Sequence, residues 1–436
     1  MPIATADTRI HVAGDGLAGS TGWRELAERR TRYTSNLVST FLNQVKTKVD
    51  QKIVRVIATI VAWGFACDSI LGLYQTNARA QNLGYDLLIT WRAESLFAVG
   101  GQPYSVRGFL YPPSILLLLR PIAGHSQASI TKYGLVLTIV ISIAAVMLAA
   151  VAIGRPWFGM TAALTTFGLS YTGAFTGELS LENVSVLCWF ALSVFLLAAI
   201  NNKWIIGGIA IGLSFAFKPL LLPLLVVFLL ARQWKALLVA IGLPFILNLV
   251  AVIFVADPMA VLSKLPSLTN RVGTGVNFNS AWVDVARNLG WPEFVTILIR
   301  SFTAIVAVGA TWISWTRIDD KRLRLITSSS VLLIGTYLAG TISEYHFMLT
   351  LVPLLMTVVV AGSVMRIPIS WIGGAWMMTV LILPGKLLGL GIDANNSAFR
   401  AFGMSIILLS VFFWHLRKAK DIPKKDDQLA TEFNAT

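Results

Sequence analysis

Asp86 is the carboxylate of this sequence that is best placed for acid–base chemistry. It lies in the polar stretch YDLLITWRAE, just after the first apolar segment, in a chain with only 21 acidic residues among 436. We expect it to accept a proton from a substrate, although it could instead cap a loop helix or pair with Arg79 or Arg92. Glu94 follows more than two helical turns later if the stretch is helical, so the two acids need not share a site.

Lys218 is the first candidate for binding an anion such as a phosphate. It interrupts the apolar run GLSFAFKPLLLPLL beside Pro219, which removes a backbone donor and kinks a helix. An ammonium in such a run is costly unless it meets an anion, snorkels to the interface, or pairs with an acid such as Glu178 or Glu182. The sequence leaves these alternatives open.

His346 is the second candidate, because it is one of only four histidines and follows Glu344 and Tyr345 at a predicted helix boundary. The neighbouring acid and phenol could orient its imidazole toward a phosphate. A histidine at such a boundary could equally be an ordinary interfacial residue.

A later polar segment, 257–294, has the composition of a carbohydrate-binding surface, with Lys264, Arg271, Asn277, Asn279, Trp282 and Asp284. Aromatic rings stack on sugar faces and amides bind hydroxyl groups, but an aromatic belt at a membrane edge has the same composition and is favoured for most of the tryptophans. Arg271 is the best phosphate ligand of this segment. No spacing typical of metal ligands stands out in the polar loops, so we expect neither a metal nor a cofactor.

The elements that position these residues must be membrane helices. Hydrophobic residues make up 56% of the chain and charged residues only 13%, which a soluble fold of this size could not hide. Backbone in lipid must satisfy its own hydrogen bonds, so we predict an all-α polytopic membrane protein. About twelve spans are expected, near 53–75, 110–123, 133–153, 157–173, 183–200, 204–231, 236–256, 295–315, 325–343, 346–364, 368–384 and 399–415.

The distribution of charge predicts the orientation. The net charge of +14 lies in short basic patches beside apolar segments, which is typical of cytoplasmic loops and argues against nucleic acid as a partner. We expect a basic N-terminal segment at 1–52 with an interfacial helix at 35–52, a transmembrane domain at 53–416 and a tail at 417–436. Both termini would be cytoplasmic, and the long loops 76–109 and 257–294 would face outward.

Two segments strain this topology. The run 204–231 is longer than one span and is broken at Lys218, so it could form two half-helices. The loop 173–183 carries two acids yet falls on the cytoplasmic side of the twelve-span topology, so the middle spans could instead be short or re-entrant. Cys67 and Cys188 lie in apolar runs, so we expect packing residues and not a disulfide or a metal site.

Several stretches resemble a known family. The acid in the first external loop, the Tyr111-Pro112-Pro113 start of the second span and the segment ending in Lys218-Pro219 resemble the polyprenyl-phosphate-sugar-dependent glycosyltransferases of superfamily C. Within that superfamily the similarity is closest to the actinobacterial cell-wall arabinofuranosyltransferases that form α-(1→3) branches. It is carried by DLLITWRAESLF, FLYPPSILLLL, GLSFAFKPLLLPLL, ARQWKALLVA, VADPMAVLSKLP and VNFNSAW.

The resemblance implies transfer of arabinofuranose from decaprenyl-phosphoryl arabinose, a donor held in the membrane lipids, to the arabinan of arabinogalactan or lipoarabinomannan. Asp86 would be the general base of an inverting reaction on the outer face. The family often has two adjacent acids at this point, whereas here the first position is Tyr85. We expect the donor phosphate to meet Lys218, His346, Arg271 and Arg92, and the substrates to meet Tyr111, Glu344, Tyr345, Asn279 and Trp282.

Two other functions fit the sequence. A mannosyltransferase of the same superfamily that uses polyprenyl-phosphate mannose would share Asp86, the Tyr-Pro-Pro motif and Lys218-Pro219. A transporter or lipid flippase would have the same hydropathy. It would be expected to show internal repeats and charges along a path through the membrane, and neither is evident.

Overall fold

The computed structural model describes residues 51–80, 83–255, 257–259, 261, 263, 279–378 and 392–418. The chain divides into two units, Met1–Ile60 and Val61–Thr436, and residues 51–60 of the first unit are helical. Lys264, Arg271 and Asn277 lie outside the described residues. So does almost all of the predicted interfacial helix 35–52 and of the predicted tail 417–436.

The described residues form helices and no strand, which confirms the all-α prediction. An isolated β-bridge joins Asn279 to Glu344. Among the described residues, five helices are long and apolar enough to cross a membrane, as expected of a multi-pass membrane protein. They are Gln51–Asn77, α4 (Gln127–Ala152), α10 (Trp234–Ile253), α13 (Glu293–Arg317) and Asn396–Arg417 within α17 (Ile392–Lys418). The count of twelve spans stays a prediction.

Shorter elements lie between these helices. The first half of the chain contains α2 (Tyr85–Ala98), η1 (Pro103–Ser105), α3 (Ser114–Leu118), η2 (Arg120–Ile122), α5 (Met160–Leu169), α6 (Gly173–Leu181), α7 (Ser185–Ile200), α8 (Trp204–Phe217), η3 (Pro219–Leu224) and α9 (Leu225–Leu230). The second half contains α12 (Trp282–Asn288), α14 (Lys321–Ala339), η4 (Tyr345–Leu351), α15 (Val352–Met356), η5 (Thr357–Val359), η6 (Val364–Arg366) and α16 (Pro368–Met378).

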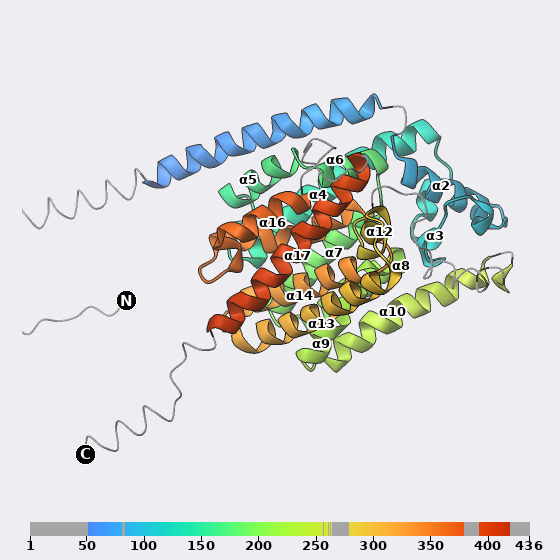
Figure 1. Cartoon of the computed structure of the whole chain (residues 1–436). Coiled ribbons are helices and arrows are strands. Elements are labelled where there is room, and N and C mark those ends of the chain that lie inside the picture. The colour runs from blue at the N-terminus through green and yellow to red at the C-terminus, as the bar shows by residue number, and fades with distance from the viewer. Residues whose placement is uncertain are drawn as a thin grey trace, which may run out of the picture. The chain divides into compact units, whose positions relative to one another are not determined.

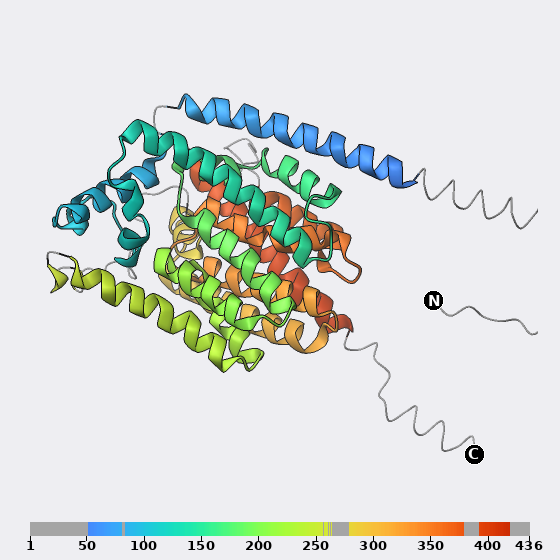
Figure 2. The ribbon, with the colours of Figure 1, turned by 180° about the vertical axis from the view of Figure 1, so that it is seen from behind.

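Helices α7 and α14 carry many of the buried residues at the centre of the second unit. Helix α8 packs against α7 and α10, α14 packs against α13, and α17 packs against α13 and α16. Large side chains such as Trp189, Phe195 and Tyr337 are fully buried there. Figures 1 and 2 show α2 and α3 beyond one end of this bundle, close to the end of α8.

The predicted break at Lys218 is confirmed. Helix α8 ends at Phe217, and Lys218 is extended, with φ −158° and ψ 124°. Pro219 cannot donate a hydrogen bond to the preceding turn, so the α-helix does not continue, and the 3-10 helix η3 begins there. The ring of Phe228 in α9 then lies 6.1 Å from that of Trp204 at the start of α8. The chain therefore reverses at Lys218 and places this residue at the tip of an antiparallel pair.

The expected side of the loop 173–183 is wrong. It was placed opposite the loop 76–109, but Gly84 donates a backbone hydrogen bond of 2.8 Å to Ser180 O, so the two segments lie together. The error comes from the apolar run 110–123, which contains only the five-residue α3 and the three-residue η2. Proline residues in this run limit its helical hydrogen bonding, and it is too short to cross a membrane as one helix.

Candidate active site

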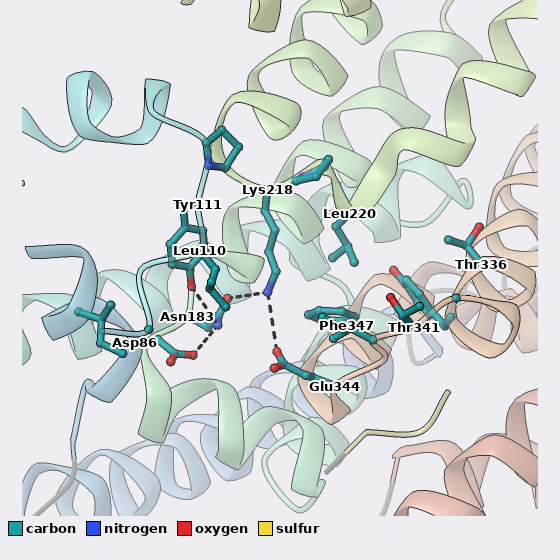
Figure 3. A pocket seen from close by; sticks show the side chains of 17 residues that line it. Asp86, Leu110, Tyr111, Asn183, Lys218, Leu220, Thr336, Thr341, Glu344 and Phe347 are labelled. Carbon is teal, nitrogen blue, oxygen red and sulfur yellow. Dashed lines mark hydrogen bonds and ion pairs between the residues drawn. The ribbon is translucent and has the colours of Figure 1, made fainter. Parts of the chain in front are cut away.

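A cavity of about 540 Å³ opens where α2, the Tyr-Pro-Pro segment and the ends of α8 and α14 meet (Figure 3). One part of its wall is apolar and includes Leu110, Pro112, Pro219, Leu220, Ile342 and Phe347. The other part carries the polar groups Asp86, Tyr111, Asn183, Lys218, Thr341 and Glu344. A cavity of this size with a few convergent polar groups is the usual form of a small-molecule site.

Asp86 lies in the first turn of α2, directly after a turn that needs glycine. Gly84 has φ +71°, a left-handed conformation that is readily adopted by glycine. Its backbone amide donates the hydrogen bond to Ser180 O in α6. The Asp86 carboxylate accepts a hydrogen bond of 2.5 Å from Nδ2 of Asn183. The same Nδ2 lies 3.4 Å from the Tyr111 hydroxyl, so Asn183 links the carboxylate to the Tyr-Pro-Pro motif.

Lys218 reaches the same amide from the opposite side. Its Nζ donates to Oδ1 of Asn183 at 3.3 Å and to Oγ of Ser185 at 3.0 Å. It lies 3.8 Å from a carboxylate oxygen of Glu344 and 4.3 Å from the centre of the Phe347 ring. Figure 3 shows the Lys218 side chain pointing into the cavity between Asn183 and Glu344.

Glu344 and His346 form a pair next to Lys218. The Glu344 carboxylate lies 3.0 Å from Nε2 of His346, whose side chain is almost fully buried. Burial alone would raise the pKa of Glu344, but the contact with His346 and the charge of Lys218 lower it to about 2. Glu344 is therefore ionised at neutral pH and partly balances the ammonium of Lys218.

The pKa of Asp86 is raised above its ordinary value. Burial is the main cause, and the negative charge of Glu344 adds to it. The hydrogen bond from Asn183 is the largest effect that opposes the shift, and the nearby His346 and Lys218 side chains add to this opposition. A carboxylate with a raised pKa is a stronger base, which suits a group that must accept a proton.

Asn279 holds the segment that carries Glu344. Its Nδ2 donates to Thr341 O at 2.8 Å, and its Oδ1 accepts from the backbone amides of Ser343 at 2.6 Å and Ala281 at 3.1 Å. The side chain is buried and does not line the cavity. Asn279 thus positions Glu344 and is not placed to contact a substrate itself.

Three other predicted site residues, Arg92, Tyr345 and Trp282, do not line this cavity. Arg92 is exposed and lines a separate depression together with Gln127 and Thr131. Tyr345 lines a second cavity. Trp282 is buried against Trp291 and Phe402, with ring centres 6.2 and 5.5 Å apart, so it packs between helices. Arg271 lies outside the described residues.

Three residues of this site were not predicted from the sequence: Asn183, Ser185 and Phe347. Asn183 ends the polar stretch ELSLEN in otherwise apolar surroundings, and that contrast could have marked it. The expected topology places its loop, 173–183, on the side of the membrane opposite Asp86, so the sequence offers no reason to put Asn183 in the same site. Within the described ranges, no group of three or more His, Cys, Asp or Glu residues could hold a metal ion.

A sequence model of glycosyltransferase family 87 matches residues 109–341, which is more than half of the chain. The chain belongs to this family. The matched region includes Tyr111, Asn183 and Lys218, whereas Asp86 and Glu344 fall just outside it. The resemblance to glycosyltransferases is therefore confirmed.

Three relatives of this family 87 chain bear the name α-(1→3)-arabinofuranosyltransferase. The protein of Mycobacterium tuberculosis is 32% identical over 283 residues, which cover 62% of this chain and 64% of the relative. That of Mycolicibacterium smegmatis is 28% identical over 369 residues, or 80% and 83% of the two chains. That of Corynebacterium glutamicum is 24% identical over 286 residues, or 62% and 65%.

We predict that Asn279→Ala destabilises the protein and impairs the site. The substitution leaves the buried amides of Ala281 and Ser343 without their acceptor, which costs more than about 2 kcal/mol of unfolding free energy. Thermal unfolding in detergent should show a clear fall in melting temperature. Asn201→Ala is the control, because Asn201 is exposed and makes one hydrogen bond within its own helix turn. Equal melting temperatures for the two variants would contradict the assignment.

Proposed function

We propose that this family 87 glycosyltransferase transfers an arabinofuranosyl residue from decaprenyl-phosphoryl arabinose to arabinan and forms α-(1→3) branches. The names of its relatives support the sugar and the linkage. The observation that carries the proposal is the cavity itself, in which a half-buried carboxylate and an ammonium flank one amide beside an apolar wall. We further propose that this end of the bundle faces outward and that both termini are cytoplasmic.

The apolar wall suits a lipid-linked donor. Leu110, Pro112, Pro219 and Leu220 would contact the first isoprene units of the polyprenyl chain, while the rest of the chain lies in the bilayer. The donor phosphate would meet Lys218, whose Nζ lies 3.3 Å from Oδ1 of Asn183 and 4.3 Å from the centre of the apolar Phe347 ring. An ammonium–phosphate contact is a charge-assisted hydrogen bond and gains strength away from bulk water.

Asp86 acts as the general base of the reaction. As the acceptor hydroxyl oxygen bonds to the anomeric carbon, the bond from that carbon to the phosphate oxygen breaks and the hydroxyl proton passes to Asp86. The bonding electrons leave with polyprenyl phosphate, where Lys218 stabilises the added negative charge. Attack opposite the leaving group inverts the anomeric centre.

The choice of donor sugar tests the proposal most directly. Purified protein in detergent should transfer arabinose from decaprenyl-phosphoryl arabinose to an oligoarabinoside, and should show little or no transfer from polyprenyl-phosphate mannose. Products are measured by mass spectrometry. Preferred transfer of mannose would overturn the arabinose assignment. Failure with both donors, with movement of lipid-linked sugar across reconstituted vesicles, would instead favour a transporter.

We predict that Asp86→Asn abolishes transfer while the fold and donor binding are kept. The amide can still accept the hydrogen bond from Asn183 but cannot take up the proton, so kcat should fall by about 10² to 10⁴-fold. Asp319→Asn, at an exposed position between α13 and α14, is the control and should keep full activity. Undiminished transfer by the Asp86→Asn variant would refute the role of Asp86 as base.

The pH dependence should change in Asn183→Ala. Burial raises the pKa of Asp86 and the hydrogen bond from Asn183 lowers it, so loss of that bond raises the pKa further. Since Asp86 accepts a proton only when ionised, the low-pH limb of the kcat/KM profile should move to higher pH. Asn201→Ala should leave the limb in place. A limb in Asn183→Ala that stays where it is or moves to lower pH would contradict this.

A further inference from the structure

A second cavity, of about 400 Å³, is separate from the active-site cavity and is lined by residues of α6. It is formed by the end of the helix Gln51–Asn77, by α6, by the start of η4 and by α17. Its polar lining includes Asn77, Thr176, Ser180, Tyr345, Asn396 and Arg400. Nothing in the reaction proposed above uses this cavity.

The lining has the chemistry of a carbohydrate site. Amide, hydroxyl and phenol groups predominate, and Leu73 is the one aliphatic residue larger than glycine among the described residues of the wall. The cation, Arg400, is only 4% exposed, and its guanidinium lies 5.3 Å from the centre of the Tyr345 ring. A lipid tail would need a more apolar wall, whereas sugar hydroxyl groups pair with amides and hydroxyls.

Two chain segments join this cavity to the active site. Glu344 lines the first cavity and the next residue, Tyr345, lines the second. Ser180 lines the second cavity, and its carbonyl holds Gly84, two residues before Asp86. The Tyr345 ring packs closely against α6 because residue 177 is a glycine. A Cβ at this position would overlap the ring.

We infer that the second cavity binds a neutral sugar unit of the acceptor, remote from the hydroxyl group that is attacked. An acceptor of several sugar units would place its reacting end at Asp86 and an earlier unit among Asn77, Thr176 and Arg400. This inference rests on the proposed function, since it assumes a polysaccharide acceptor. It adds a length-dependent subsite to the active site.

Asn77→Ala tests the inference with acceptors of two lengths. Asn77 is 8% exposed, and its Nδ2 donates to Leu73 O in its own helix, so the helix should tolerate alanine. For a synthetic oligoarabinoside of six units we expect KM to rise about fivefold, the equivalent of one lost hydrogen bond. The KM for a disaccharide, the KM for the donor and kcat should not change.

Matched variants exclude a general effect on the fold. Asn201→Ala removes an amide that makes the same bond to the carbonyl four residues earlier, and it should change no constant. Thr176→Val should act like Asn77→Ala. Thr303→Val is its control, since Thr303 makes the same type of bond within α13. A rise in KM that is equal for both acceptors, a rise in donor KM, or no change at all would overturn the subsite.

Different experimental results would contradict the proposed function and the proposed subsite. If the wild-type protein transfers no arabinose, the proposed function fails, and binding to the Asp86→Asn protein still tests the cavity. Saturation-transfer NMR with the six-unit oligoarabinoside should then show binding that Asn77→Ala weakens about fivefold. Binding that is unaffected by Asn77→Ala, or that inorganic phosphate abolishes, would show that the cavity is not a site for neutral sugars.

Discussion

The side-chain amide of Asn183 is the interaction on which the active site depends. Its Nδ2 donates to Asp86 and its Oδ1 accepts from Lys218. The Oδ1 also accepts from the backbone amide of Ser185 at 2.9 Å and from the Ser185 hydroxyl at 2.7 Å, so the amide can have only one orientation. One planar group therefore fixes the positions of α2, the start of α7 and the break after α8.

This arrangement keeps opposite charges close without letting them neutralise each other. A direct pair between Asp86 and Lys218 would stabilise the ionised carboxylate and weaken it as a base. The intervening amide satisfies both groups, and Glu344, at 3.8 Å, is the carboxylate that pairs with Lys218. Burying unpaired charges is expensive, so the loss of one member of the network would leave its partners less well stabilised. Its members come from segments far apart in the sequence, which explains why the cavity needs the whole bundle.

The charged members of this network are predictable from the sequence, whereas the amide is not. Asp86, Lys218 and Glu344 stand out because ionisable residues are rare and costly in an apolar chain. The proline after Lys218 also predicts the helix break at this point. Asn183 carries no charge, and its side of the membrane depended on counting spans. The run 110–123 is apolar enough to be counted, yet its prolines shorten its helices, and this one error reversed the expected side of loop 173–183.

Trp282 and Asn279 show a second limit of sequence reasoning. A ring that stacks on a sugar and a ring that packs between helices have the same residue type, and only the buried contacts with Trp291 and Phe402 show the packing role. Asn279 contributes through the backbone of Thr341 and Ser343, which sequence patterns do not reveal. Its effect is to fix the short segment whose consecutive residues, Glu344 and Tyr345, face two different cavities. Asn279 holds this segment through its backbone, and α6 packs against the Tyr345 ring. A shift of the segment would therefore move Glu344, which pairs with Lys218, and Lys218 in turn donates to Asn183.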